Sequence, residues 1–221
     1  MPDKKTVTIV QTSLVSHQHL NELFAKIIPE AEVHNIIDDS LLKEVSSRGS
    51  ITPGIVNRLC KYFDAAASIG SDLILNQCSS VGEAAAIAAK TVGIPVLRVD
   101  EAMAEKAVEL GKKIGVVATV ASTVSPSCNL VRAKAEAVGK IVEIVPYLVD
   151  GAMHVLMKEG REKHNALVKR TVVECARDCD VVVLAQGSMV VLVPELTDIT
   201  KPVLSSPELG VQKARTVLFG K

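Results

Sequence analysis

Three segments from the first half of the chain recur in the second half at one constant spacing of 108 residues. The matched pairs are "DKKTVTIV" at Asp3 with "GKKIGVVA" at Gly111, "EVHNII" at Glu32 with "KIVEIV" at Lys140, and "DLILNQCSS" at Asp72 with "DVVVLAQGS" at Asp180. A fourth pair, "IPVL" at Ile94 and "KPVL" at Lys201, departs from this spacing by one residue. Self-similarity at a fixed spacing indicates that one structural unit has been duplicated.

Short β-branched runs alternate with longer alanine-rich or amphipathic stretches along the whole chain. The predicted strands are residues 6–11, 33–37, 72–76, 95–99, 113–118, 141–145, 181–184 and 203–204. The predicted helices are residues 20–28, 53–68, 81–92, 125–138 and 163–177, a short helix after residue 184, and a last helix from Pro207. Strands that are apolar almost throughout are typical of parallel sheets covered by helices on both faces.

The pattern therefore predicts an α/β fold of two pseudo-symmetric Rossmann-like lobes, each a parallel sheet flanked by helices. Ligands of open α/β sheets bind at the carboxyl ends of the strands. A pseudo-twofold axis would bring these ends of the two lobes face to face. We expect the site in a cleft between the lobes.

Composition excludes several other classes of function. Lys and Arg number 25, as do Asp and Glu, and aromatic residues make up only 2%, so neither the charge nor the stacking residues of a nucleic-acid-binding protein are present. No stretch approaches the roughly 20 apolar residues of a membrane span. The N-terminus is read as a strand and not as a signal peptide. Five cysteines without paired spacing suggest free thiols and a cytoplasmic protein.

One of these cysteines, Cys78, follows the third predicted strand and precedes a predicted helix. Ser80 and Glu83 have the spacing of a capping box with Ser80 as N-cap. Backbone N–H groups at a helix start favour an anion, so this position favours a thiolate. The same amides, with the hydroxyls of Ser79 and Ser80, would suit a substrate carboxylate. The plain alternative is a small buried residue at a strand end.

The duplication pairs Cys78 with Gln186, and pairs Ser79 and Ser80 with Gly187 and Ser188. A glutamine side chain donates and accepts hydrogen bonds but takes up no proton near neutral pH. Cys78 and Gln186 are the predicted catalytic residues, one a titratable thiol and the other an amide. The remaining polar residues at these strand ends are predicted to bind substrate, and they are Gln11, Thr12, Ser13 and Gln77 together with Ser79, Ser80, Gly187 and Ser188.

The chain resembles the aspartate/glutamate/hydantoin racemase superfamily in three features. They are the duplicated halves, "NQCSS" after the third strand, and "GVVATVASTV" at the start of the second lobe. The resemblance covers nearly the whole chain. It includes "PVLSSPELGVQKA", whose helix in that family returns to the first lobe. It implies a first α/β lobe of residues 1–102 and 207–221 and a second of residues 103–206. "LAQGSM" occupies the place of the second-lobe glycine-cysteine phrase.

The resemblance implies a racemase-like isomerase without a cofactor or metal, acting on the carbon beside the carboxylate of an amino acid or related small acid. In that family a pair of cysteines on opposite faces of the substrate exchanges the proton. Cys78 looks like the first-lobe cysteine, and Gln186 departs from the pattern. The residues that look like the carboxylate-holding groups are Asn76, Ser79, Thr119, Ser122 and Thr123. The expected partners are a small carboxylate substrate and further copies of the chain, with no nucleic acid and no membrane.

Other functions stay open at this stage. With one cysteine, the same fold suits a decarboxylase or an isomerase. A cysteine hydrolase or amidase would pair Cys78 with His17 or His19, which could alternatively bind a metal or lie exposed at a helix start. A non-catalytic two-lobe protein could bind a carboxylate.

Predictions also concern one polar segment and the other four cysteines. Residues 38–52 form either a solvated loop or one that closes over the cleft and brings Arg48 to a carboxylate. Cys175 and Cys179 share a helix face and are read as packing residues. Cys60 and Cys128 lie in helical stretches and are read in the same way.

Overall fold

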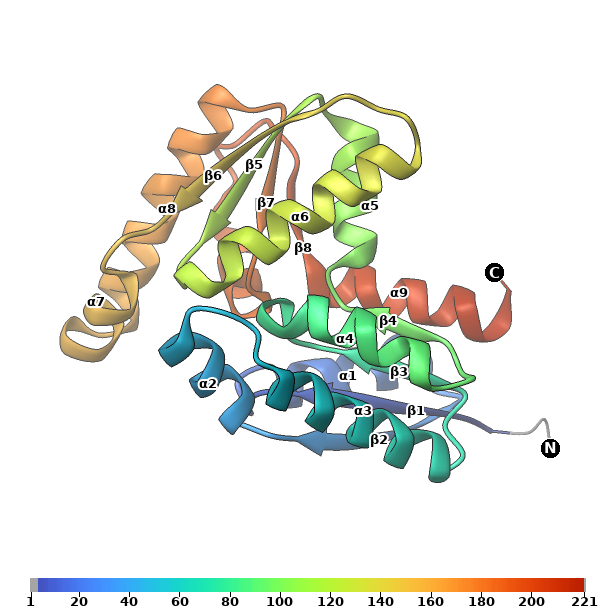
Figure 1. The fold of residues 1–221 in the computed structure, drawn as a ribbon. Helices are drawn as coiled ribbons and strands as arrows, with labels where there is room; N and C mark the ends of the chain where they lie inside the picture. Colours follow the sequence, from blue (N-terminus) through green and yellow to red (C-terminus); the bar gives the residue numbers. More distant parts are fainter. Residues whose placement is uncertain (1–3, 221) are drawn as a thin grey trace. The chain divides into compact units, whose positions relative to one another are not determined.

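A computed structural model describes residues 4–220, including every side chain in that range except that of Met153. The residues divide into two compact units, shown along the chain in Figure 1. Unit 1 comprises Met1–Asp100 and Pro207–Lys221, and unit 2 comprises Glu101–Ser206. Each unit has its own sheet and its own buried core.

The sheet of unit 1 is parallel throughout, and its order within residues 4–220 is β2-β1-β3-β4. The strands are β1 (Lys5–Gln11), β2 (Ala31–Ile37), β3 (Leu73–Asn76) and β4 (Val96–Arg98). The central strand β1 is buried on both faces of the sheet. Its residues Val7 and Ile9 pack into one apolar cluster, and Val10 packs into another. The apolar runs of the sequence therefore correspond to strands covered on both sides.

Helices cover both faces of this sheet (Figure 1). They are α1 (His17–Ile27), α2 (Ser40–Arg48), α3 (Pro53–Ser68), α4 (Gly82–Ala88) and α9 (Ser206–Phe219), with the 3-10 turns η1 (Ser79–Val81) and η2 (Ala89–Thr91). Phe24 of α1 and Val211 of α9 belong to one apolar cluster, and Phe63 of α3 and Ala84 of α4 belong to the other. The chain thus completes unit 1 with its last helix.

Unit 2 has the same strand order, β6-β5-β7-β8, in the part of the chain that the structure describes, and its strands are also parallel. Its strands are β5 (Lys113–Ala118), β6 (Glu143–Leu148), β7 (Val181–Leu184) and β8 (Val203–Ser205). Its helices are α5 (Glu101–Leu110), α6 (Ala121–Ala137), α7 (Ala152–Glu159), α8 (Arg161–Asp178) and the 3-10 helix η3 (Gly187–Glu195). No helix among the described residues has both the length and the apolar character needed to cross a membrane.

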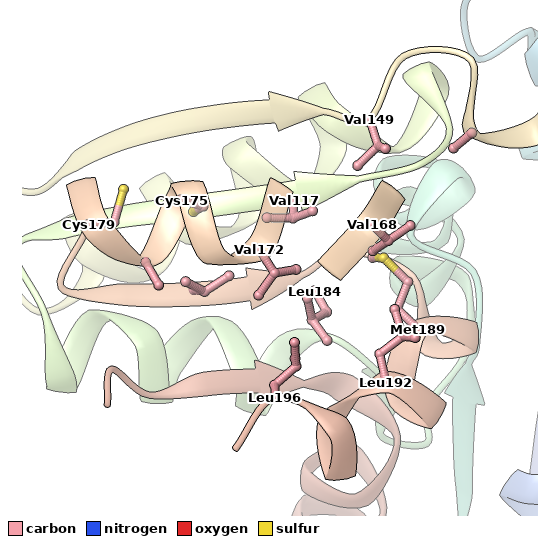
Figure 2. Close-up of a cluster of buried hydrophobic side chains, with 13 residues drawn as sticks. Val117, Val149, Val168, Val172, Cys175, Cys179, Leu184, Met189, Leu192 and Leu196 are labelled. Atoms are coloured by element: carbon pink, nitrogen blue, oxygen red, sulfur yellow. The ribbon is translucent and has the colours of Figure 1, made fainter. Parts of the chain in front are cut away.

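The core of unit 2 lies between α8, the sheet and η3, as Figure 2 shows. Val172 and Cys175 of α8 face Val117 of β5 and Leu184 of β7, and Met189 of η3 packs against the same group. Burial of such side chains contributes about 1.5–3 kcal/mol each. The two sheets confirm the predicted α/β fold, and their common strand order is consistent with duplication.

The second strand of the repeat departs from the predicted spacing. Lys5 pairs with Ala31 in unit 1, whereas Lys113 pairs with Glu143 in unit 2, so β6 is displaced by four residues from a strict repeat of 108. The predicted strand of residues 141–145 was consequently placed too early. Pro146 lies inside β6, which the sequence did not lead us to expect. An edge strand tolerates proline because one side of its backbone needs no partner.

Residues 38–52 are not a loop, because α2 occupies Ser40–Arg48. Asp38 holds this helix against α3 by accepting hydrogen bonds from Tyr62 at 2.7 Å and from Arg58 at 3.1 Å. Burial alone would raise the pKa of Asp38, but bonds from Ser40 and Tyr62 and the charge of Arg58 lower it below its usual value. Arg48 is exposed in the last turn of α2. A closing loop that carries Arg48 has no basis in this arrangement.

Candidate functional site

Cys78 lies at the carboxyl edge of the unit 1 sheet, two residues beyond the end of β3. Its carbonyl oxygen accepts hydrogen bonds from Asn76 Nδ2 at 3.0 Å and from the Val81 backbone N–H at 3.3 Å. The residue is half-buried, and its side chain packs against the apolar cluster of unit 1 that includes Ile74 and Val81. Cys78 is therefore a half-buried thiol on a peptide group whose carbonyl is fixed by two hydrogen bonds.

The predicted capping box is wrong in its register. The turn η1 begins the helical segment, with Cys78 as its N-cap, and α4 follows with Val81 as N-cap. Ser80 is a buried residue inside η1, and neither cap makes a side-chain capping bond. Cys78 thus stands closer to the helical segment than the capping box implied, because the chain makes a 3-10 turn before α4.

The polar residues predicted for the first half-site lie at the ends of the neighbouring strands β1 and β3. Gln11, Thr12, Asn76, Ser79 and Ser80 are buried, and Ser13 and Gln77 are half-buried. The register pairs Val10 with Asn76, and Gln77 N–H donates to Val10 C=O at 2.9 Å. The structure therefore brings these residues to one edge of one sheet.

An ion pair at the end of β4 packs against the start of α4. Arg98 Nε and Nη2 donate to Asp100 Oδ1 and Oδ2 at 3.0 and 2.8 Å. The Arg98 and Asp100 side chains are only 13% and 2% exposed. A Cβ added to Gly82 would meet the guanidinium, so the absent side chain makes room for this pair four residues after Cys78.

Gly82→Ala is expected to destabilise unit 1 by about 1–3 kcal/mol, the typical cost of overpacking. Urea unfolding measures this change. Gly54→Ala is the matched control, since Gly54 is also helical and its added Cβ would lie 3.5 Å and 3.8 Å from its nearest neighbours. The control is expected to be neutral or stabilising, because alanine is the better helix former. Equal effects of the two substitutions would contradict close packing of Arg98 on Gly82.

Gln186 occupies the corresponding edge of the unit 2 sheet, after β7. Its Oε1 accepts hydrogen bonds from the Thr119 backbone N–H at 3.0 Å and from the Thr119 hydroxyl at 3.3 Å. A backbone N–H can only donate, so this contact fixes which end of the amide is oxygen. Gln186 Nε2 is buried without a hydrogen-bond partner among the described residues. The amide is therefore a fixed donor.

The other predicted residues of unit 2 surround the starts of α6 and η3. Thr119 and Thr123 are buried, and the Thr123 N–H donates to Val120 C=O at 3.0 Å in the first turn of α6. Ser122 is half-buried, and Gly187 and Ser188 begin η3 with Ser188 exposed. Thr119, Gly187 and Ser188 follow the ends of β5 and β7, and Ser122 and Thr123 lie in the first turn of α6, which begins just after β5.

The two histidines proposed as partners of Cys78 lie on α1. His17 Nδ1 is 3.1 Å from Gln11 Nε2 and 3.4 Å from Asn21 Nδ2. Within residues 4–220, neither His17 nor His19 makes a hydrogen bond to Cys78. Across the same residues no group of three or more His, Cys, Asp or Glu side chains is arranged to hold a metal ion.

The remaining cysteines differ from Cys78 in burial or in position. Burial raises the pKa of the Cys128, Cys175 and Cys179 thiols. Cys175 and Cys179 pack in the unit 2 core (Figure 2) and lie against Gly115. This agrees with their interpretation as packing residues. Cys60 is half-buried within α3.

The sequence analysis missed two groups of residues. Arg98, Asp100 and Gly82 pack together where β4 ends and α4 begins. Asn21 and Asn35 orient the amide of Gln11. Two oppositely charged residues at the end of a strand were a signal for the first group, since Arg98 ends β4 and Asp100 follows two residues later. Asn35 was concealed inside a strand pattern, where a polar residue suggests an outward-facing side chain. Its side chain instead accepts a hydrogen bond from Gln11 Nε2 at 2.7 Å.

Comparisons with known proteins agree with this arrangement of strands and helices. Picrophilus torridus aspartate racemase superposes with a TM-score of 0.71 at 18% identity, covering 95% of this chain and 94% of that one. Allantoin racemase from Klebsiella pneumoniae gives 0.65 at 15% identity, covering 98% and 89%. A mutant of arylmalonate decarboxylase, in a sulfate-associated form, gives 0.64 at 16% identity, covering 98% and 94%.

At these identities the structural likenesses establish the fold. No curated protein matches the sequence significantly. A sequence model of one family, however, matches residues 7–214, which is nearly the whole chain. The chain belongs to the Asp/Glu/Hydantoin racemase family.

Proposed function

We propose that the protein is a cofactor-independent enzyme that transfers a proton at the carbon next to a carboxylate, with Cys78 as the acid and base. The observation that carries this proposal is the placement of one half-buried thiol at a sheet edge among buried polar side chains. Membership of a racemase family supports the same reaction class. The proposed substrate is an amino acid or a related small acid.

In the proposed reaction, the Cys78 thiolate takes the proton from the substrate carbon. The electron pair of the broken C–H bond moves toward the carboxylate and forms an enolate. The thiol then returns a proton to the same carbon, and exchange of the thiol proton with solvent labels the product. Fixed hydrogen-bond donors stabilise a developing enolate without reorganising during the reaction.

Gln186 is proposed as such a donor and not as a second base. Its Oε1 is occupied by Thr119, and its Nε2 carries two protons without an acceptor among the described residues. Nε2 would therefore donate to an oxygen of the substrate. A single acid/base delivers its proton to one face of the carbon.

Hydrogen exchange in heavy water tests the proposal. The wild-type protein is incubated with single enantiomers of amino acids, hydantoins and N-carbamoyl amino acids. The proton on the carbon beside the carboxyl group, or beside the corresponding ring carbonyl of a hydantoin, is followed by NMR. We expect deuterium to enter with retention of configuration and inversion to be at least about tenfold slower, because Gln186, unlike the Cys78 thiol, neither takes up nor releases a proton near neutral pH. Heat-denatured protein controls for uncatalysed exchange.

Gln186→Cys is expected to accelerate inversion relative to exchange, because it supplies a second thiol at the corresponding position of the repeat. The ratio of the two rates is read by NMR and chiral chromatography. Rapid inversion by the wild-type protein would contradict a single acid/base. No exchange with any compound would contradict proton transfer itself.

A decarboxylase with one cysteine is the second candidate, because position 186 carries an amide in place of a second acid/base. Loss of carbon dioxide leaves an enolate that needs stabilisation by a donor and one protonation. Substituted malonates distinguish the two candidates. Release of carbon dioxide with formation of one product enantiomer would favour the decarboxylase over the isomerase.

A further inference from the structure

The strand β2 forms one edge of the unit 1 sheet, and among the described residues it is paired with β1 alone (Figure 1). The Asp38 N–H, just after β2, donates to Gln11 C=O at 3.0 Å. Backbone groups of successive residues point to opposite sides of a strand, so every second residue counted back from Asp38 faces β1. Val33 and Asn35 consequently direct their N–H and C=O groups outward, away from the sheet.

The other three sheet edges within residues 4–220 are closed to a further strand. The edge strands β4 and β8 have only three residues each. In β6 the N–H groups of Glu143 and Val149 are bonded on the β5 side, so Pro146 stands on the free side, where its ring replaces an N–H. Short strands and prolines protect sheet edges from pairing. By contrast, β2 has seven residues and no proline.

The side chains of β2 are incompletely covered within unit 1. None of the seven is buried, whereas five of the seven in β1 are buried. Val33 lies at the margin of one apolar cluster. On the opposite face of the strand, the Glu32 and His34 side chains are 49% and 40% exposed, and His34 Nε2 lies 3.6 Å from Glu32 Oε1. A partner strand would meet an apolar side chain on one face and these two polar groups on the other.

A second copy of β2 is complementary to this edge in one register. A twofold axis at the edge pairs the strand antiparallel with its own copy. With the axis at Val33, Val33 faces its copy, and Glu32 of each chain faces His34 of the partner. A carboxylate opposite an imidazole is a favourable cross-strand pair. Moving the axis by one residue would place Glu32 or His34 opposite its own copy, and moving it by two would place Glu32 opposite Asp38 or Glu30.

We propose that β2 is a homodimer interface, at which two chains join their unit 1 sheets edge to edge about a twofold axis at Val33. The two four-stranded sheets then form one continuous sheet. The outward N–H and C=O groups of Val33 and Asn35 gain partners across the axis. This interface does not depend on the reaction proposed above.

Sedimentation velocity of the full chain over a dilution series tests the proposal. We expect a dimer to form at protein concentrations of about 100 µM or below, as for a transient interface of small area. His34→Glu is expected to weaken the dimer at least about tenfold, because it places a second carboxylate opposite Glu32 at two symmetric positions. A monomer at every concentration, or a dimer that His34→Glu leaves intact, would overturn the proposal.

An exchange of charges separates pairing at β2 from a loss of folding. Glu32→Lys combined with His34→Glu again sets opposite charges against each other and is expected to restore the dimer. Ile141→Glu is the matched control, since Ile141 is 93% exposed and lies two residues before Glu143, at the edge strand of unit 2. The control is expected to leave the dimer unchanged. A loss of the dimer in Ile141→Glu, or no recovery in the double variant, would contradict pairing at β2.

Hydrogen exchange of the unmodified protein gives a readout without any substitution. The outward N–H groups of Val33 and Asn35 are expected to exchange more slowly at a concentration where the dimer forms than at high dilution, because pairing occupies them. Amides of β6 serve as the reference and are expected to exchange equally at both concentrations. Exchange from β2 that is independent of concentration, in a protein that dimerises, would place the interface elsewhere and overturn the proposal.

Discussion

Cys78→Ala is expected to lower the rate of hydrogen exchange at the substrate carbon by about 10²- to 10⁴-fold, the usual contribution of a general acid or base. The expectation follows from the position of the thiol at the end of β3 and from the lack of a second titratable group at position 186. Initial rates of deuterium incorporation by NMR, at equal protein concentration, measure the effect.

Cys60→Ala is the matched control for this experiment. Cys60 is the other half-buried cysteine among the described residues, and it lies on α3 in the same unit. Its replacement is expected to leave the exchange rate within a factor of two or three. Comparable losses in both variants would show that the effect comes from the fold of unit 1 and not from a proton-carrying thiol.

Arg98→Met is expected to destabilise the protein by about 3–5 kcal/mol, because it leaves the Asp100 carboxylate buried without its partner. Asp100 is 2% exposed, and two of its hydrogen bonds come from the arginine. Urea unfolding followed by circular dichroism measures the change, with the first transition assigned to unit 1 if the two units unfold separately.

Two further variants separate the buried charge from the packing around it. Arg98→Met combined with Asp100→Leu removes both charges and is expected to recover most of the lost stability. Lys5→Met breaks the pair with Asp72, whose side chains are 37% and 33% exposed, and is expected to cost no more than about 1 kcal/mol. A double variant as unstable as Arg98→Met would mean that the arginine acts through packing on Gly82.

The sequence was most informative where local pattern and tertiary burial agree. Residues 113–118 and 181–184 were predicted as strands and are β5 and β7 to the residue, because an apolar run between polar or turn residues is a sufficient signal for a buried strand. The helix α2 was missed because its sequence is polar. Contacts from Arg58 and Tyr62, both distant in sequence, stabilise its position.

The strand ends predicted many of the residues at each candidate half-site, and the family resemblance added Thr119, Ser122 and Thr123. Orientation could not be predicted in this way. The direction of the Gln186 amide depends on Thr119, 67 residues earlier, and that of Gln11 depends on a series of contacts through Asn35 and Asn21. The sequence specifies an amide side chain but not which end of it faces the ligand. Only tertiary contacts determine whether the amide presents a donor or an acceptor.

The return of α9 to unit 1 affects the order in which the chain can fold during synthesis. Val211 and Ala214 belong to the same core cluster as Val7 and Phe24, and Arg215 Nη1 donates to Ile27 C=O at 2.5 Å. Unit 2 is therefore an insertion whose residues are all translated before unit 1 is complete. A ribosome that stalls near residue 206 would carry all of unit 2, but a first unit that exposes one face of its core. Joining the termini and opening the chain near residue 100 would make both units continuous.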